Sequence, residues 1–231
     1  FNKYDLLSLP VVDHENRLVG IVTIDDAVDV MEEEATEDFE KMAAMHPSEK
    51  PYLKTGVFEL AKNRIVWLLV LMISSMLTGG ILTRYEDAFK VMPLLVSFVP
   101  MLTDTGGNAG SQSSTMIIRG MTIGEIASSD ILKVIWKEAR VSVIVGIILG
   151  AVNFVRLVVQ YPGQPLVALT VVLALFATIF LAKVIGGMLP IAAKKLHLDP
   201  AIMAAPLITT IVDAVSLVIY FQIAVELLHI K

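Results

Sequence analysis

The chain has 231 residues, of which 55% are hydrophobic, and a mean hydropathy of +0.73. This composition excludes an ordinary soluble domain and is typical of a polytopic membrane protein with a soluble N-terminal part. The net charge is -5, and nine acidic residues lie from Asp25 to Glu40, so the acidity belongs to one soluble segment. The sequence shows no pattern of basic residues typical of a nucleic-acid-binding protein.

Residues 1–29 are predicted to form a strand, a turn, a second strand and the start of a helix. The strands are Leu9–Val12 and Leu18–Val22, and Thr23 can cap the helix, whose first turn is acidic. Two short strands cannot bury a core alone. We therefore expect this stretch to be the end of a larger soluble domain, and the chain to be the C-terminal part of a longer protein.

An acidic helix is predicted to follow and to end near Met45. Its acids, with only Lys41 among them to compensate, can be a solvated face or a site for divalent cations, which would relieve the repulsion between carboxylates. A break at Pro47–Pro51 and an amphipathic lead-in at Tyr52–Lys62 then connect the helix to the membrane part.

Hydrophobic stretches long enough to cross a bilayer fill the rest of the chain. The five are Ile65–Thr83, Val91–Ile118, Val141–Tyr161, Pro162–Ala193 and Pro200–Val225. Asp213 is the only charged residue of the last stretch. A helix beginning at Pro200 would place it roughly 20 Å from that end, near the bilayer midplane. A carboxylate there costs about 2.5 to 3.5 kcal/mol, so it indicates a functional site.

Basic residues predict the orientation in the membrane. Ten lie on the side of the soluble N-terminal part, namely Lys50, Lys54, Lys62, Arg64, Arg119, Lys133, Lys137, Arg140, Lys194 and Lys195. Four lie on the opposite side, namely Arg84, Lys90, Arg156 and Lys231. We therefore expect a multi-pass cell-membrane protein with a cytoplasmic N-terminus and an external C-terminus.

The second span carries a polar stripe, which we define as Asp104, Asn108, Ser111 and Thr115. These residues share one helix face because they recur at i, i+4, i+7 and i+11. Three glycines in the same span permit close backbone approach or a local break. Helix packing alone is the alternative explanation, but an Asp and an Asn on one face exceed what packing needs.

The fifth span repeats the pattern, with Thr209, Asp213, Ser216 and Tyr220 on one side and Thr210 adjacent. Pro206 is expected to deprive the carbonyl of Ile202 of its helical partner and so free it as a ligand. Carboxylate, hydroxyl and carbonyl oxygens suit hard cations, and Mg²⁺ usually keeps several of its waters. Two chains about a two-fold axis would supply two Asp213 carboxylates to one divalent ion.

These motifs together resemble the MgtE family of magnesium channels and transporters. The resemblance rests on the TGGNAGxQ core within Pro100–Gln112, on Asp199-Pro200-Ala201 and on Pro206–Asp213. In addition, Leu9–Asp26 resembles the end of the second CBS domain that precedes the membrane part of that family. The resemblance covers the whole chain.

The resemblance implies an all-α polytopic membrane protein, a homodimer with five transmembrane helices per chain and an ion path along the dimer axis. A fragment of an α/β CBS domain would occupy 1–29, an acidic connecting (plug) helix and lead-in 30–62, and the ion-conducting domain 63–231. The expected pore residues are Asp213, Asn108, Asp104, Thr209 and Thr210, and the expected regulatory metal ligands are Asp26, Asp29, Glu34, Glu37 and Asp38. Some family members carry Asn where this chain has Ala205.

The favoured hypothesis is a Mg²⁺-selective pathway into the cytosol, driven by the electrochemical gradient and closed by cytosolic Mg²⁺ at the acidic helix. Mg²⁺ would then be both cargo and regulator, and the partners would be a second copy, membrane lipid and divalent ions. A gradient-coupled cation exchanger is the alternative. A membrane-embedded metal-dependent enzyme is less favoured, because the sequence offers no nucleophile, histidine ligand or catalytic loop to accompany the carboxylates.

Overall fold

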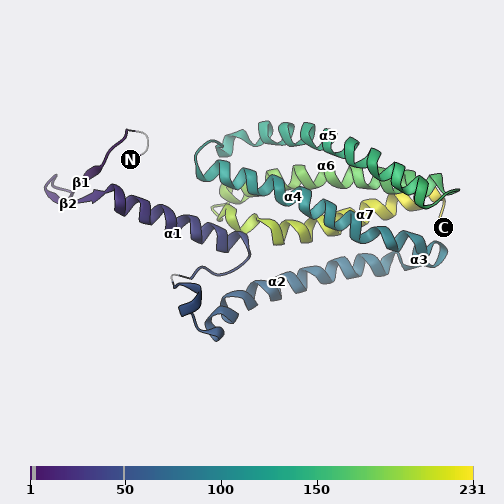
Figure 1. Ribbon diagram of the computed structural model, residues 1–231, viewed down its shortest axis with the longest axis horizontal. Helices are drawn as coiled ribbons and strands as arrows, with labels where there is room; N and C mark the ends of the chain where they lie inside the picture. The colour runs from purple at the N-terminus through teal and green to yellow at the C-terminus, as the bar shows by residue number, and fades with distance from the viewer. Residues whose placement is uncertain (2–3, 49, 231) are drawn as a thin grey trace.

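A bundle of long helices dominates the computed structural model, which describes residues 1, 4–48 and 50–230 (Figure 1). The elements are β1 (Ser8–Val12), β2 (Leu18–Thr23), α1 (Ile24–Met42), α2 (Val57–Arg84), α3 (Glu86–Val91), α4 (Val99–Thr122), α5 (Ile131–Gln160), α6 (Pro165–Lys195) and α7 (Ala205–Leu228). Short 3₁₀ helices are η1 (Tyr52–Lys54), η2 (Pro93–Phe98), η3 (Ser128–Asp130) and η4 (Pro200–Met203). The core lies where α4, α6 and α7 pack together, with α5 against α6.

The N-terminal strands pair as predicted. β1 and β2 are antiparallel, with Ser8 opposite Thr23, and Asp13 closes the turn by accepting hydrogen bonds from the backbone N–H groups of Glu15 and Arg17 at 2.8 and 2.9 Å. Most of their apolar side chains are exposed. The pair therefore needs a partner surface.

The acidic helix α1 begins at a capping box, as the sequence indicates. The carboxylate of Asp26 accepts hydrogen bonds from the backbone N–H and the hydroxyl of Thr23, at 2.9 and 2.6 Å. These bonds lower the pKa of Asp26. The helix ends at Met42 rather than near Met45, and the predicted break follows it. Figure 1 shows α1 leading from the strand pair to one end of the bundle.

The predicted spans all fall on helices, but they are not equally apolar. Within the described part of the chain, four segments are long and apolar enough to cross a membrane: α2, η3 with α5, α6, and α7. The second predicted span begins as η2, and α4 starts only at Val99. Because α4 carries the polar stripe and many small residues, it lies outside that group although it packs against α6 and α7.

Glycines let α4 approach its neighbours closely. A Cβ on Gly106 would lie 2.6 Å from Thr178 Cγ2, and one on Gly110 would lie 2.7 Å from Ile208 Cγ2. A Cβ on Gly186 of α6 would overlap the carbonyl oxygen of Gly110. The predicted close approach is confirmed, whereas a local break is not found, since α4 is continuous from Val99 to Thr122.

The start of the fifth span differs from the prediction. Ala204 has an extended backbone (φ −91°, ψ −163°) between η4 and α7, so α7 begins at Ala205 and Pro206 lies in its first turn. The prediction that Pro206 frees the carbonyl of Ile202 inside a helix was wrong, because a proline in the first turn removes no helical hydrogen bond. Asp213 consequently lies about 12 Å along α7 rather than 20 Å along a longer helix.

Asp199 caps the start of η4. Its side chain accepts a hydrogen bond from the backbone N–H of Ala201 at 2.9 Å.

α2 is largely uncovered in the single chain. None of its 28 residues is buried, and it meets the bundle mainly through α7. Figure 1 shows α2 beside the bundle and apart from it over much of its length. At the end of α2, Tyr85 stacks on Phe221 with ring centroids 4.8 Å apart. An apolar helix of this kind requires lipid or another chain against it.

Candidate cation pathway and the contact of α1

The polar stripe of α4 faces away from the bundle. Asp104, Asn108 and Thr115 are exposed in the single chain, while Ser111 is half-buried and its hydroxyl has no partner among the described residues. The opposite face of α4 is buried against α6 and α7. Lipid offers no hydrogen bonds to such a stripe, so it requires water, ions or another protein surface.

α7 brings Asp213 beside this stripe. The carboxylates of Asp213 and Asp104 lie close enough to repel one another, and neither forms an ion pair with a described residue. Thr209 packs against Gly107, where an added Cβ would lie 2.9 Å from Thr209 Cγ2. Asn108 directly follows Gly107 on α4. Two carboxylates without a basic partner at one helix contact would be stabilised by a bound cation.

The threonine hydroxyls of α7 are oriented by the backbone. Thr209 Oγ1 and Thr210 Oγ1 donate to the carbonyl oxygen of Pro206 at 2.9 and 3.0 Å. Because their hydrogens are engaged, these hydroxyls present lone pairs to any other partner. They are therefore suited to accept hydrogen bonds from the water shell of a cation.

Ser216 and Tyr220 do not belong with these residues, although the helical period places them on the same side of α7. Both are buried, and the Tyr220 hydroxyl donates to the carbonyl oxygen of Leu95 at 2.8 Å. Tyr220 holds α7 against η2, whereas Ser216 packs against Gly106 of α4. The periodicity identifies a face of α7, but the C-terminal part of that face, at Ser216 and Tyr220, is used for packing.

The expected regulatory acids are spread along α1. Asp26 is engaged in the helix cap, and Asp29 and Glu34 are exposed. Glu37 and Asp38 lie at the far end, against the membrane part. No group of three or more acidic or histidine side chains suited to hold a metal occurs among residues 1, 4–48 and 50–230. These described residues of one chain thus form no closed metal cage.

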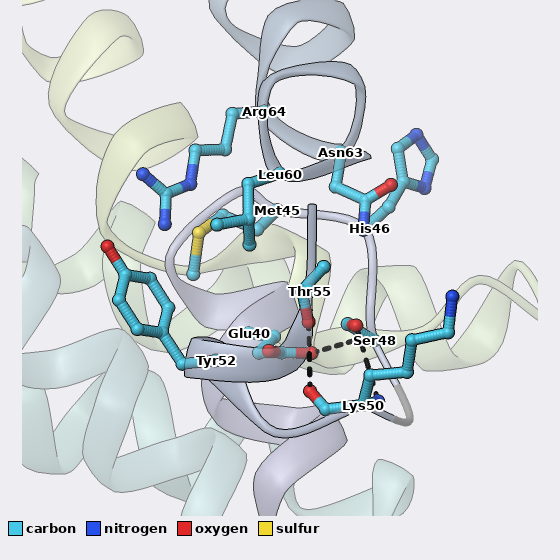
Figure 2. A pocket seen from close by; sticks show the side chains of 10 residues that line it. All are labelled: Glu40, Met45, His46, Ser48, Lys50, Tyr52, Thr55, Leu60, Asn63 and Arg64. Carbon is cyan, nitrogen blue, oxygen red and sulfur yellow. Dashed lines mark hydrogen bonds between the residues drawn. The ribbon is translucent and has the colours of Figure 1, made fainter. Parts of the chain in front are cut away.

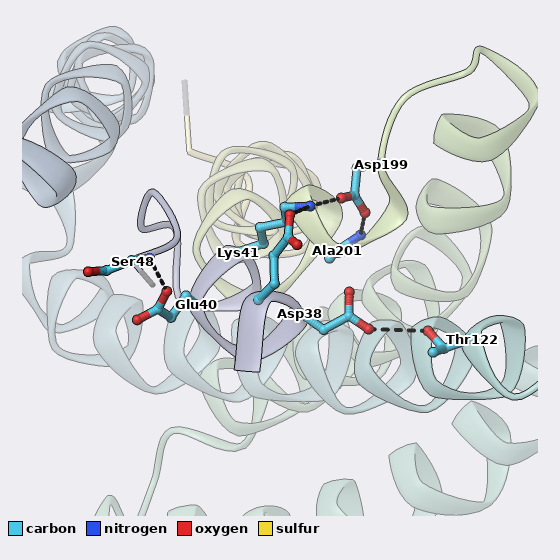
Figure 3. Close-up of polar contacts among 8 residues, drawn as sticks. Asp38, Glu40, Lys41, Ser48, Thr122, Asp199 and Ala201 are labelled. Carbon is cyan, nitrogen blue, oxygen red and sulfur yellow. Dashed lines mark hydrogen bonds and ion pairs between the residues drawn. The ribbon is translucent and has the colours of Figure 1, made fainter. Parts of the chain in front are cut away.

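Lys41 fixes the end of α1 to the membrane part (Figure 3). Its ammonium group contacts Asp199 Oδ2 at 2.7 Å and Glu37 Oε1 at 2.5 Å. Asp38 accepts a hydrogen bond of 3.5 Å from the hydroxyl of Thr122, at the end of α4. Two carboxylates therefore contact one ammonium group here, and a third, that of Asp38, lies near enough to interact with their charges.

These contacts shift the pKa values of the groups involved. Partial burial raises the pKa of Asp199, but the hydrogen bonds from Lys41 and Ala201 and the Lys41 charge outweigh it, so the net pKa is lowered. The pKa of Lys41 is raised by its hydrogen bonds to Asp199 and Glu37. Burial and the Asp199 charge raise the pKa of Asp38. The ion pair therefore persists at neutral pH, while Asp38 opposes docking when it is ionised.

A pH dependence of α1 docking follows from these directions. Docking favours protonated Asp38, so the docked fraction rises as the pH falls from 7 through the raised pKa of Asp38. Docking favours ionised Asp199, so the fraction falls again below its ordinary pKa of 3.8, as Asp199 is protonated. Spin labels on Ala35→Cys and Leu196→Cys, both exposed positions, would measure the docked fraction as a short-distance population.

Asp38→Asn is the matched control for this titration, because it removes the group that opposes docking. The variant is expected to lose the rise between pH 7 and 4 and to keep the fall at lower pH. A rise that persists in Asp38→Asn would contradict the assignment to Asp38.

The linker after α1 encloses a small cavity of about 130 Å³ (Figure 2). Glu40 accepts a hydrogen bond from the backbone N–H of Ser48 at 2.7 Å, and Thr55 donates to the carbonyls of Lys50 and Pro51 at 3.3 and 3.1 Å. These bonds order the turn between α1 and α2. The predicted break is thus an ordered turn, which fixes the direction of α1 relative to α2.

Two polar contacts were not anticipated from the sequence. One is the ion pair between Lys41 and Asp199, which are 158 residues apart. The other is a buried lysine, Lys183, near Ser113 and Glu138. The signal for the second was available, since a charged residue inside an apolar span indicates a partner. Nothing in the local pattern indicates the first.

Comparison with known proteins identifies the family. The family model described as MgtE, divalent cation transporter, matches residues 99–223, and the CBS domain model matches residues 1–33. The magnesium transporter MgtE of Thermus thermophilus is 39% identical over 98% of this chain and 50% of its own length. The magnesium transporter MgtE of Bacillus subtilis is 37% identical over 98% of this chain and 50% of its own length.

The magnesium transporter MgtE of Enterococcus faecalis is 31% identical over 96% of this chain and 48% of its own length. The chain thus spans about half the length of the curated relatives it matches. The transporter model covers more than half of the chain and contains α4, α5, α6 and most of α7. The chain is therefore a member of the MgtE family of divalent cation transporters, with a match to the CBS domain at residues 1–33.

Proposed function

We propose that two copies of this chain form a Mg²⁺ pathway along their two-fold axis, lined by the polar stripe of α4 and by Asp213 of α7. The observation that carries the proposal is the uncovered stripe, with Asp104 and Asp213 repelling one another beside it. The curated relatives are named magnesium transporters. Their family consists of transporters, which agrees with the expectation that the chain is not an enzyme.

A second copy supplies what one chain lacks. One chain offers Asp104 and Asp213, whose like charges repel, and no third acidic ligand among the described residues. Juxtaposing two copies doubles the carboxylates and covers the exposed stripe, and a two-fold dimer is the commonest closed assembly. The uncovered apolar helix α2 also favours an additional partner surface.

The residues at the site suit hydrated Mg²⁺ better than a fully dehydrated ion. Asn108, Thr209 and Thr210 present oxygen acceptors rather than a rigid cage, and the threonine hydroxyl hydrogens are already engaged. Mg²⁺ dehydrates reluctantly and usually retains several waters. We infer that Asp213 attracts the ion, while the neutral oxygens accept hydrogen bonds from its water shell.

α1 is proposed to act as the cytosolic plug. Its end docks beside the end of α4 and the start of η4, and Figure 1 shows the two chain ends at opposite ends of the molecule. This supports a cytoplasmic N-terminus and an external C-terminus, although Lys231 of the basic-residue count lies outside the described residues. Cytosolic Mg²⁺ would relieve repulsion among Glu37, Asp38 and Asp199 and so favour the docked, closed state.

Regulation would extend along α1 toward the strand pair. Asp26, Asp29 and Glu34 lie nearer the strand pair. We propose that they complete Mg²⁺ sites with acidic groups of the neighbouring soluble domains, because one chain does not bring them together.

Metal flux into liposomes tests the proposal. The whole chain is reconstituted, a membrane potential is imposed, and entry of Mg²⁺, Ca²⁺ and Na⁺ is followed with ion-selective dyes. We expect Mg²⁺ entry driven by the potential alone, exceeding Ca²⁺ and Na⁺ entry and falling as Mg²⁺ is raised on the plug side. Entry that requires a Na⁺ or proton gradient would instead support the exchanger.

A further inference from the structure

A lysine is buried inside the membrane part on the side away from the polar stripe. Lys183 of α6 is 5% exposed, and its ammonium group lies 3.5 Å from Ser113 Oγ of α4. The Ser113 hydroxyl lies 2.5 Å from Glu138 Oε2 of α5, to which it donates. An ammonium, a hydroxyl and a carboxylate from three helices thus form one hydrogen-bonded chain, which we call the Lys183 network.

The network carries compensating charges. Glu138 is the acidic residue at its end, and no ion pair within 4.0 Å joins Lys183 directly to a described carboxylate. The hydroxyl of Ser113, a residue that is 2% exposed, therefore bridges the two charged groups by hydrogen bonds. Ionisable groups at this depth are costly, so a buried pair with its mediating hydroxyl calls for a specific role.

Ser113 lies directly behind the polar stripe. It follows Asp104 by nine residues, which corresponds to about two and a half helical turns, so the two side chains project from opposite faces of α4. Ser113 is buried, whereas Asp104 is exposed in the single chain. Any rotation of α4 that displaces Ser113 from Glu138 must also turn the stripe away from its present direction.

One part of the α4 interface has no interlocking side chains. Its contact with α6 includes the backbones of Gly110 and Gly186, which approach closely but have no side chains to interlock. Directional hydrogen bonds supply what such smooth surfaces lack. On the other flank, Ser114 Oγ donates to the carbonyl oxygen of Met203 at 2.6 Å. The Lys183 network is the charged member of this pair of attachments.

We propose that Lys183 and Glu138 are positioning residues that, through Ser113, hold α4 with its polar stripe toward the ion pathway. The inference rests on the proposed function, because it assumes that the stripe lines the pathway. Loss of one charge leaves the other unpaired in the membrane, so the carboxylate moves toward water and releases Ser113. α4 then turns, and the ion meets a different set of oxygens.

Single-cysteine accessibility tests the inference, because the chain has no cysteine of its own. Thr115→Cys places a thiol on the stripe, and a water-soluble methanethiosulfonate reagent reports its contact with water. We expect rapid modification in the otherwise unchanged chain. Adding Lys183→Met is expected to slow modification by about twofold to thirtyfold, the range over which network residues shift a conformational equilibrium. The readout is the rate constant of thiol modification. A variant that yields fewer folded copies lowers the amount of modified protein but leaves this rate constant unchanged.

Two matched variants separate positioning from a general loss of charge or stability. Lys137→Met removes an exposed positive charge next to Glu138 and is expected to leave the rate unchanged. Lys183→Met combined with Glu138→Gln leaves no unpaired charge, and the glutamine carbonyl can still accept from Ser113, so the rate should return to that of the reporter alone. The ratio of Mg²⁺ to Ca²⁺ entry should fall in Lys183→Met and recover in the double variant.

The outcomes distinguish this inference from the proposed function. Failure of the reagent to modify Thr115→Cys without further changes would show that the stripe is not in water, which overturns the pathway itself. Rapid modification that is unaltered by Lys183→Met would leave the pathway intact and overturn the positioning role. A double variant that stays as slow as Lys183→Met would also overturn it, because pairing of charge would not be the cause.

Discussion

Asp213→Ala is expected to reduce Mg²⁺ entry into liposomes by at least about a hundredfold while leaving a folded membrane protein. At an effective dielectric constant of 20, one unit charge pair at 4 Å is worth about 4 kcal/mol, and 1.36 kcal/mol changes a rate tenfold. Asp213 is half-buried and has no ion pair with a described residue, so its substitution breaks no ion pair among them. Flux and the chromatographic profile should be measured on the same preparation.

Two substitutions serve as controls for this experiment. Asp213→Asn retains the shape and the oxygen acceptor but removes the charge, so it should reduce Mg²⁺ entry less than Asp213→Ala and lower the preference for Mg²⁺ over Na⁺. Asp104→Ala should reduce entry less than either, since Asp104 is exposed and water screens it more. Unchanged Mg²⁺ entry in Asp213→Ala would refute the assignment of Asp213 to the pathway.

Local chemistry made part of the fold predictable. Thr23 is at the predicted helix cap, where Asp26 of the acidic first turn accepts its hydrogen bonds, and Asp199 caps η4. The glycines of α4 do allow close helix approach. In each case a short stretch of sequence contains all the interacting groups, or the residue type has one dominant structural use.

Features that depend on tertiary packing were not predictable in the same way. The extended backbone of Ala204, which starts α7 late, has no sequence signal of its own, because alanine is a strong helix former. The burial of Tyr220 depends on the position of η2, and the ion pair of Lys41 depends on where α1 ends against Asp199. Periodicity assigns residues to a face but does not say what covers that face.

The candidate pathway was predictable as a set of residues rather than as a site. At the contact between α4 and α7, Thr209 packs against Gly107, and the charges of Asp104 and Asp213 repel one another. Completing the arrangement about a two-fold axis remains a proposal. The sequence therefore indicates which chemistry is present, while the packing of α4 decides the direction in which it faces.

Gly186→Leu is expected to abolish the folded membrane part, because it fills the space that α4 occupies. Even a single Cβ at this position would overlap the carbonyl oxygen of Gly110, and backbone cannot move aside as a flexible side chain can. Overpacking by a few atoms in a closed core typically costs about 1 to 3 kcal/mol, and a whole leucine side chain against backbone exceeds that range. The yield of monodisperse protein in detergent, measured by size-exclusion chromatography, reports the loss.

Gly80→Leu is the matched control, since it makes the same change on α2. A Cβ at Gly80 meets no atom within 4 Å, and both glycines lie inside long apolar helices. A similar loss in both variants would mean that any added leucine disrupts the protein or that α2 is tightly covered in the assembly. A loss confined to Gly186→Leu would mean that the contact between α4 and α6 fixes the position of α4 and of its polar stripe. The pathway would then depend on Gly186, a residue that is not part of the stripe.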